Sequence, residues 1–207
     1  MTKQKGETMS DVLMMTDEQV RDQIVNELLL TCDNEVETER MKNLIGWMDN
    51  SGFFSGPCSS GNHLCMMGGL AKHSLNVLEC ADKLATAWGA YGKVSRKDVT
   101  LAALLHDLGK AGDHGLEGYV PNVLKSGAVS KAKPYERNKE LKPIPHEQRS
   151  VMIAERYIEL SQDVEWAIAA HAGLYGEYKY VIPGNETPLY LIISTADMWA
   201  SRVVEDQ

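Results

Sequence analysis

Five apolar segments of this chain are each interrupted by a histidine or an aspartate, and this pattern constrains the fold most. The clearest case is Leu104-Leu105-His106-Asp107-Leu108, where two polar side chains stand in an apolar run. Placing an unpaired polar group in an apolar interior costs roughly 2–7 kcal/mol, and a charge costs more. One shared polar centre explains all the interruptions better than five separate exceptions do, so we expect the segments to converge. The other interrupting residues are His73, His146, His171 and Asp197.

The spacing of apolar residues predicts a mostly helical domain. Ser95 is the expected N-cap of the segment that carries His106, and Thr187 with Pro188 marks the start of the last helix. One short strand is expected over residues 178–182. Helical patterns cover residues 16–49, a block in which Leu70, His73, Val77 and Ala81 share one face, and residues 97–108, 146–160, 163–172 and 188–204.

Two stretches lack helical periodicity. Residues 51–69 are rich in glycine and serine, which predicts a loop. Residues 111–145 form a long irregular segment, and a loop of that length within a domain is usually functional or partly structured. Residues 1–15 are expected to be a flexible leader, followed by one domain over 16–207.

Composition narrows the class of protein. The longest apolar runs fall far short of the ~20 residues that a membrane-spanning helix needs, so we expect no membrane association and a cytoplasmic location. Four cysteines in 207 residues do not make a disulfide scaffold. The net charge is −8, which disfavours general binding of long polyanions.

The converging residue types predict a metal centre. Mixed imidazole and carboxylate ligands suit Mn, Fe, Co, Ni, Zn or Mg, and the second oxygen of a carboxylate can bridge two ions. Lys110 follows His106 by about one helical turn, and a cation in that place suits a phosphate. Taken singly, each residue also has a structural explanation: His106-Asp107 as a helix end, His73 as a satisfied core histidine, Asp197 as a buried cap.

The order of these residues resembles that of the HD-domain superfamily of metal-dependent phosphohydrolases. The stretch from Leu105 to Lys110 is close to the superfamily's HD-x-GK form, and the resemblance covers about residues 51–200. The element Gly68-Gly69-Leu70-x-x-His73-Ser74-Leu75, with Pro57 and His63 upstream, is similar to a narrower group that includes HD-domain 3′→5′ exoribonucleases and small HD proteins of phages and their hosts.

The resemblance implies an all-α HD helical bundle, with the long irregular insertion lying between the HD helix and the next ligand helix. It also implies two divalent cations, with Asp107 bridging them. His146 and His171 would hold the second cation. The first would be held by His73, His106, Asp107 and Asp197.

Three residues are expected to be catalytic: Asp107, Lys110 and His63. Two cations would activate a water for attack on phosphorus, and Lys110 would offset charge on the phosphate oxygens. His63 could contact phosphate or protonate the leaving group, or be an ordinary loop histidine. His114 is expected on the surface. A zinc site of Cys58, His63 and Cys65 is disfavoured, because the two cysteines are seven residues apart and no second pair follows.

We expect the substrate to contact the long insertion, residues 111–145. Residues 118–145 carry six basic side chains and two carboxylates, and they lie between two expected ligands, Asp107 and His146. Tyr119 and Tyr135 in this stretch could stack on a base. The expected substrate-binding side chains are Lys110, Lys125, Lys131, Lys133 and Tyr135.

The sequence therefore predicts hydrolysis of a phosphate ester or anhydride in a small nucleotide, a nucleoside mono- or triphosphate. An HD-type nuclease or phosphodiesterase acting on RNA, DNA or a cyclic nucleotide is the first alternative. A non-catalytic nucleotide-binding module is the second. The expected partner is a small phosphorylated molecule rather than a long nucleic acid. Association of the chain into a homo-oligomer is compatible with the sequence.

Overall fold

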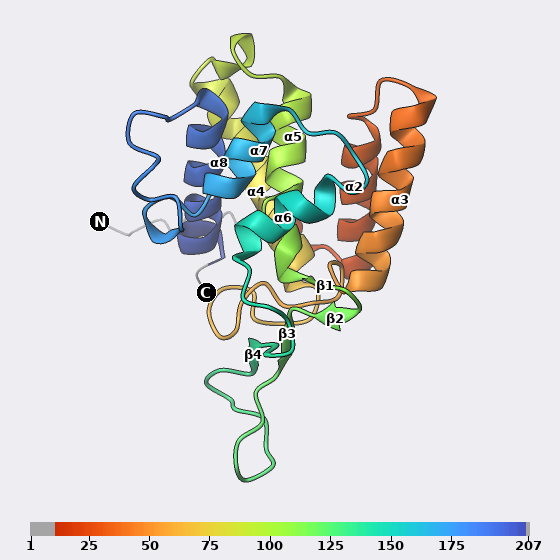
Figure 1. Cartoon of the computed structure of the whole chain (residues 1–207), viewed down its shortest axis with the longest axis vertical. Coiled ribbons are helices and arrows are strands. Elements are labelled where there is room, and N and C mark those ends of the chain that lie inside the picture. The colour runs from red at the N-terminus through yellow and green to blue at the C-terminus, as the bar shows by residue number, and fades with distance from the viewer. Residues whose placement is uncertain (1–10, 206–207) are drawn as a thin grey trace, which may run out of the picture.

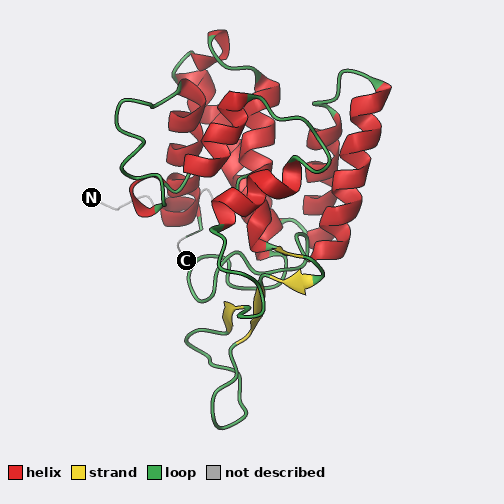
Figure 2. Cartoon of the chain, viewed as in Figure 1, coloured by secondary structure: helices red, strands yellow, loops and turns green. Residues whose placement is uncertain are grey.

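The computed structural model describes residues 11–205, and α-helices make up most of it (Figures 1 and 2). Short strands are confined to one excursion of the chain, so the predicted all-α fold class is confirmed. The helices are α1 (Asp11–Met14), α2 (Asp17–Leu29), α3 (Glu35–Ser51), α4 (Gly69–Ala87), α5 (Arg96–Leu105), α6 (His146–Ala154), α7 (Gln162–Ala170) and α8 (Pro188–Trp199).

Side-chain caps start the two helices for which they were predicted. The Ser95 hydroxyl accepts a hydrogen bond from the backbone N–H of Asp98 at the start of α5. The Thr187 hydroxyl accepts one from Tyr190, and Pro188 occupies the first turn of α8. Each cap satisfies a backbone donor that the helix itself cannot pair, so these sequence signals set where the helices begin.

Helix α4 is the centre of the bundle. It is buried almost all round over its first ten residues, Gly69 to Leu78. Helices α5 and α8 pack directly on it, and α7 packs on α5 and α8. Helix α6 packs on α7 and on a short 3₁₀ turn, η2 (Leu108–Lys110), that follows α5. Figure 1 shows the amino-terminal pair α2 and α3 standing beside this group.

The insertion between η2 and α6 forms two small hairpins. Strands β1 (Gly112–Asp113) and β2 (Leu116–Glu117) pair antiparallel, and so do β3 (Tyr119–Pro121) and β4 (Tyr135–Arg137). The long loop between β3 and β4 projects from the foot of the bundle in Figure 1. Tyr135 N–H donates to the Ser60 carbonyl at 3.3 Å, which ties this excursion to the loop before α4.

Two sequence predictions need correction. The strand expected over residues 178–182 is wrong: these residues form turns, and Tyr178 packs its ring edge-on against Trp166 at 5.7 Å. The apolar residues there reflect the packing of Tyr178 and Ile182 in a small apolar cluster rather than a strand. Residues 11–14, expected in the flexible leader, form α1 and bury Val12 completely. The rest of that leader, residues 1–10, lies outside the described residues, and a single domain over 16–207 stays a prediction.

No helix within residues 11–205 has both the length and the hydropathy needed to cross a bilayer.

Candidate metal centre

Side chains from five helical segments meet at one buried point. His73 comes from α4, His106 and Asp107 from the end of α5, His146 from the start of α6, His171 from the end of α7 and Asp197 from α8. His73, His106, Asp107 and His171 are almost completely buried. The structure thus brings together all six residues that the sequence analysis singled out as ligands.

The donor atoms lie within a few ångströms of one another. His73 Nε2 is 3.1 Å from Asp197 Oδ1 and 3.3 Å from His106 Nε2. Asp107 Oδ2 is 3.3 Å from His106 Nε2, and its Oδ1 is 3.2 Å from His146 Nε2 and 3.6 Å from His171 Nε2. Asp107 is therefore the central side chain, with one oxygen turned to each half of the cluster.

A break in the helix allows neighbouring residues to reach the same point. Successive helical side chains diverge by about 100°, which would separate His106 from Asp107. Helix α5 ends at Leu105, and Asp107 has φ −104° and ψ 11°, outside helical values. The predicted helix over 97–108 thus ends early, and η2 takes over. This change of geometry turns the Asp107 carboxylate back toward His106.

Each of the four imidazoles is oriented through its Nδ1 atom. His106 Nδ1 lies 2.8 Å from the Ala103 carbonyl, and His171 Nδ1 lies 2.7 Å from the Ile168 carbonyl. Because a carbonyl oxygen only accepts, the Nδ1 atoms carry the protons and donate them. His73 Nδ1 faces the Glu205 carboxylate at 3.0 Å, and His146 Nδ1 faces Glu147 at 3.2 Å. The Nε2 lone pairs are thereby left facing the centre.

The centre fits divalent cations. Asp107 Oδ1 is one of two buried side-chain nitrogen or oxygen atoms in the described structure that have no hydrogen-bond partner. Such an orphaned oxygen, close to the Nε2 atoms of His146 and His171, is compensated when a cation binds. Two groups of donor atoms lie within 4.8 Å of one another and are candidates to hold an ion: His73, His106 and Asp197, and His106, Asp107 and His171. The two groups share His106, whose one free nitrogen can bind only one ion.

Burial and neighbouring charges shift the pKa values of the histidines in the centre in opposite directions. Burial lowers the pKa of His73, but the charge of Glu205 and hydrogen bonds to Asp197 and Glu205 raise it well above its usual value. Burial likewise opposes charge on His171, while Asp107 raises its pKa. Burial lowers the pKa of His146 despite its contact with Asp107.

Lys110 completes the centre on the solvent side. Its Nζ lies 2.6 Å from Asp107 Oδ2, and 15% of its side chain is exposed. Burial opposes its charge, but Asp107 raises the Lys110 pKa well above its usual value, so the ammonium stays charged. A fixed cation at the edge of a cation-binding centre is suited to hold a phosphate oxygen.

His63, which the sequence analysis proposed as a catalytic residue, has Cys58 as its neighbour. His63 Nε2 lies 3.4 Å from the buried Cys58 Sγ, which is 4.0 Å from Lys110 Nζ. Cys58, His63 and His73 offer three grouped donor atoms, whereas Cys65 takes no part in any such group among the described residues. Burial, with the charge of His73, lowers the pKa of His63 to about 4. Burial raises the pKa of Cys58 to about 11.

Apart from Lys110, the expected substrate-binding residues lie on the insertion. Lys125, Lys131 and Lys133 are exposed on the projecting loop between β3 and β4, and Tyr135 is half-buried in β4. Lys133 lies beside Gly61, which belongs to the same loop as His63. The role of these four residues in substrate binding stays a prediction. His114 is exposed, as expected, with a positive φ of 53°.

Glu205 is the functional candidate that the sequence did not reveal. It is 5% exposed, follows the π-helical turn η4 (Ala200–Val204), and accepts hydrogen bonds from His73 Nδ1 and, at 2.9 Å, from Asn76 Nδ2. No periodicity or motif marks a carboxylate at this place in the chain. Only the packing of η4 on α4 brings it to His73.

We expect Glu205→Ala to lower metal affinity about 10–100-fold, because the loss of a carboxylate behind a ligating histidine has that effect. Glu205→Gln keeps an acceptor for His73 and should recover part of the affinity. Glu159→Gln is the matched control, since this glutamate is 88% exposed and pairs with Arg40 on the surface. Titration of each purified variant with Mn²⁺ measures the effect; equal affinities for Glu205→Ala and Glu159→Gln would contradict it.

Comparison with known proteins gives one match. The family model described as HD domain matches residues 70–197. The matched range begins at the start of α4 and ends at Asp197, so it contains all six converging residues. No curated protein and no solved structure matches the chain.

Proposed function

This chain belongs to the HD-domain family, and from that premise we propose that it hydrolyses a phosphate ester or anhydride of a small nucleotide with two bound divalent cations. HD domains are in general metal-dependent phosphohydrolases. The nucleotide, the number of cations and the role of each residue are our proposals. The observation that carries them is the orphaned Asp107 Oδ1 among imidazoles whose Nδ1 protons are already donated.

The contacts between these side chains support the proposed ligand roles. His73, His106, Asp107 and Asp197 would hold one cation, and His146 and His171 would hold the other together with Asp107. When bound, the cations would lower the pKa of water, so that hydroxide is available as a nucleophile at neutral pH, and they would offset the negative charge of the phosphate.

The remaining side chains would bind and orient the phosphate. Lys110 Nζ is held beside the centre by Asp107 and would donate to a non-bridging phosphate oxygen. His63, with a pKa of about 4, is neutral near pH 7 and would donate only a neutral N–H. A role for His63 as a proton donor to the leaving group therefore requires that bound phosphate raise its pKa.

Metal analysis and a substrate screen test the proposal. The purified protein should contain up to two equivalents of a divalent transition metal or Mg²⁺ per chain. It should release phosphate, pyrophosphate or tripolyphosphate from nucleoside mono-, di- or triphosphates, and a chelator should abolish the release. Faster cleavage of short RNA, DNA or cyclic nucleotides would favour the phosphodiesterase alternative. Nucleotide binding without turnover by the metal-loaded protein would favour a binding module.

A further inference from the structure

A basic cavity opens beside the metal centre. It has a volume of about 370 Å³ and lies between the insertion and the start of α6. Lys110 and His146, which both contact Asp107, form part of its wall, so the cavity adjoins the centre. Its volume is within the range of roughly 300–1,000 Å³ that is usual for small-molecule sites.

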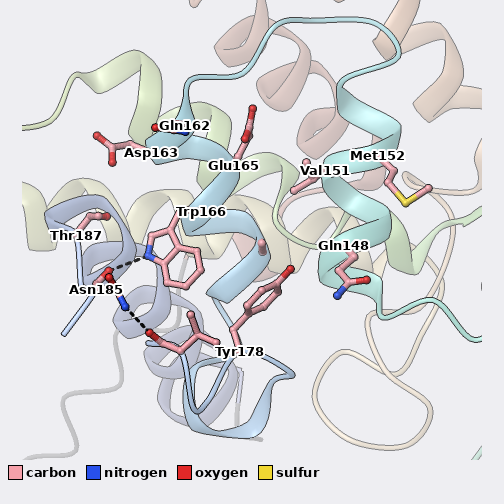
Figure 3. A pocket seen from close by; sticks show the side chains of 12 residues that line it. Gln148, Val151, Met152, Gln162, Asp163, Glu165, Trp166, Tyr178, Asn185 and Thr187 are labelled. Atoms are coloured by element: carbon pink, nitrogen blue, oxygen red, sulfur yellow. Dashed lines mark hydrogen bonds between the residues drawn. The ribbon is translucent and has the colours of Figure 1, made fainter. Parts of the chain in front are cut away.

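The lining of this cavity contains cations and no carboxylate. Four other cavities of the described structure are each lined by at least one carboxylate. The largest, about 740 Å³ between α6, α7 and the loop before α8, is lined by Trp166 and Tyr178 together with Asp163 and Glu165 (Figure 3). The basic cavity is the exception in a chain of net charge −8. Its cationic residues are Lys110, Arg137, Lys139, Lys142 and Arg149.

Two of these cations are uncompensated. Lys139 pairs with Glu136 at 2.9 Å, and the buried Arg149 lies 3.7 Å from Asp113. Within residues 11–205, no carboxylate lies within 4 Å of the charged groups of Arg137 or Lys142. Like charges that surround one small cavity repel each other, and an anion in the cavity relieves that repulsion.

The protein backbone holds the walls of the cavity in place. Arg149 donates to the Lys142 carbonyl at 2.8 Å and so ties the segment before α6 to that helix. A Cβ on Gly109 would come within 2.3 Å of the His146 carbonyl, so only glycine permits this contact between η2 and α6. On the opposite wall, Arg137 pairs with Tyr119 across β3 and β4.

We propose that this cavity binds the phosphate chain of the substrate, that is, phosphoryl groups one or two linkages away from the one that reacts at the metal centre. Arg137 and Lys142 would be the main contacts. The inference rests on the proposed function and narrows it: the substrate class becomes nucleoside di- or triphosphates rather than monophosphates. A cavity of this size suits a short oligophosphate better than a polymer.

Binding of inorganic phosphates tests the cavity directly. Calorimetric titrations of the metal-loaded protein use tripolyphosphate and orthophosphate, with Mg²⁺ in excess so that the probe does not strip the centre. The test variant is Arg137→Ala/Lys142→Ala. The control is Lys93→Ala, another exposed lysine with no described carboxylate within 4 Å, which follows the short helix η1 (Ala90–Gly92). Figure 1 shows the yellow-green segment between α4 and α5 at the end of the bundle opposite the insertion.

The wild-type protein should bind tripolyphosphate at least about tenfold more tightly than orthophosphate, because each charge-assisted contact strengthens binding by roughly that factor. The double variant should lose about tenfold or more of its tripolyphosphate affinity and keep its orthophosphate affinity. Lys93→Ala should change neither. An unchanged tripolyphosphate affinity in the double variant, or an equal loss for both probes, would overturn the proposal. So would tighter binding of a short oligonucleotide than of tripolyphosphate.

A second substrate separates failure of the cavity from failure of the proposed function. Bis(p-nitrophenyl) phosphate has a single phosphorus and cannot reach a subsite for a phosphate chain. If the wild type hydrolyses it and the double variant matches that rate, the centre works, and the tripolyphosphate titration alone decides on the cavity. If the metal-loaded wild type hydrolyses no phosphate compound, the proposed function is wrong, and with it the role of the cavity in a substrate complex.

Discussion

Replacing Asp107 with alanine should lower hydrolysis by at least about a thousandfold and remove most of the bound metal. Both oxygens of this carboxylate are used: Oδ1 faces His146 and His171, and Oδ2 faces His106 and Lys110. Without it, neither proposed cation keeps its anionic bridge. Metal content by mass spectrometry and phosphate release on the same preparation measure the two effects together.

The variant also leaves a buried cation without its partner. Lys110 Nζ would lose the carboxylate at 2.6 Å, and breaking a buried pair from one side typically costs about 3–5 kcal/mol of stability. Asp113→Ala is the matched control, because Asp113 is buried and pairs with Arg156 at 2.8 Å outside the centre. The Asp113→Ala variant should lose stability but keep its bound metal. Full activity and full metal content in Asp107→Ala would refute the ligand assignment.

Removing the metal should destabilise the protein more at alkaline than at slightly acid pH. Without metal, His73 and His171 have raised pKa values. Their contribution to stability is complete below the unfolded pKa of about 6.5 and is lost as pH rises through their folded values. The pKa of His63 and His146 is lowered, so their contribution is lost as pH falls below about 6.5. The metal-free protein should therefore be most stable near pH 6.5.

Above pH 6.5, the stability of the metal-loaded protein should instead increase as the pH rises. Cations need unprotonated Nε2 atoms, so their binding releases protons and strengthens as pH rises. A ligand at a thousand times its dissociation constant adds about 4.1 kcal/mol of stability, which corresponds to roughly 10 °C in the melting temperature of a chain of this size. Thermal unfolding between about pH 5 and 9, with and without a chelator, measures the difference. A chelated protein that is most stable above pH 8 would contradict these pKa directions.

Much of the site was predictable because each of its residues interrupts an apolar pattern. His73, His106, Asp107, His146, His171 and Asp197 stand in helical segments whose burial is readable from periodicity, and the structure places all six at one point. The resemblance to the HD-domain superfamily is confirmed by the family model, whereas the narrower similarity to HD-domain exoribonucleases stays a prediction.

The expected substrate residues show where sequence reasoning stops. A net positive charge over residues 118–145 marked the insertion as basic, but not which side chains face the centre. The pairing of β3 with β4 carries Lys125, Lys131 and Lys133 out on the projecting loop, while Arg137 and Lys142 line the basic cavity. Register and loop direction depend on contacts with the loop before α4, which no local pattern encodes.

The sequence by itself determined that helices must converge on a polar centre of imidazoles and carboxylates, since buried polar groups need partners wherever apolar faces are packed. Tertiary structure decided how that centre is oriented. The departure from helical geometry at Asp107 turns its carboxylate toward His106, and the turn η4 delivers Glu205 to His73. Both depend on contacts between segments far apart in the chain. Burial is encoded locally by periodicity, whereas the direction of a side chain is set by what packs against it.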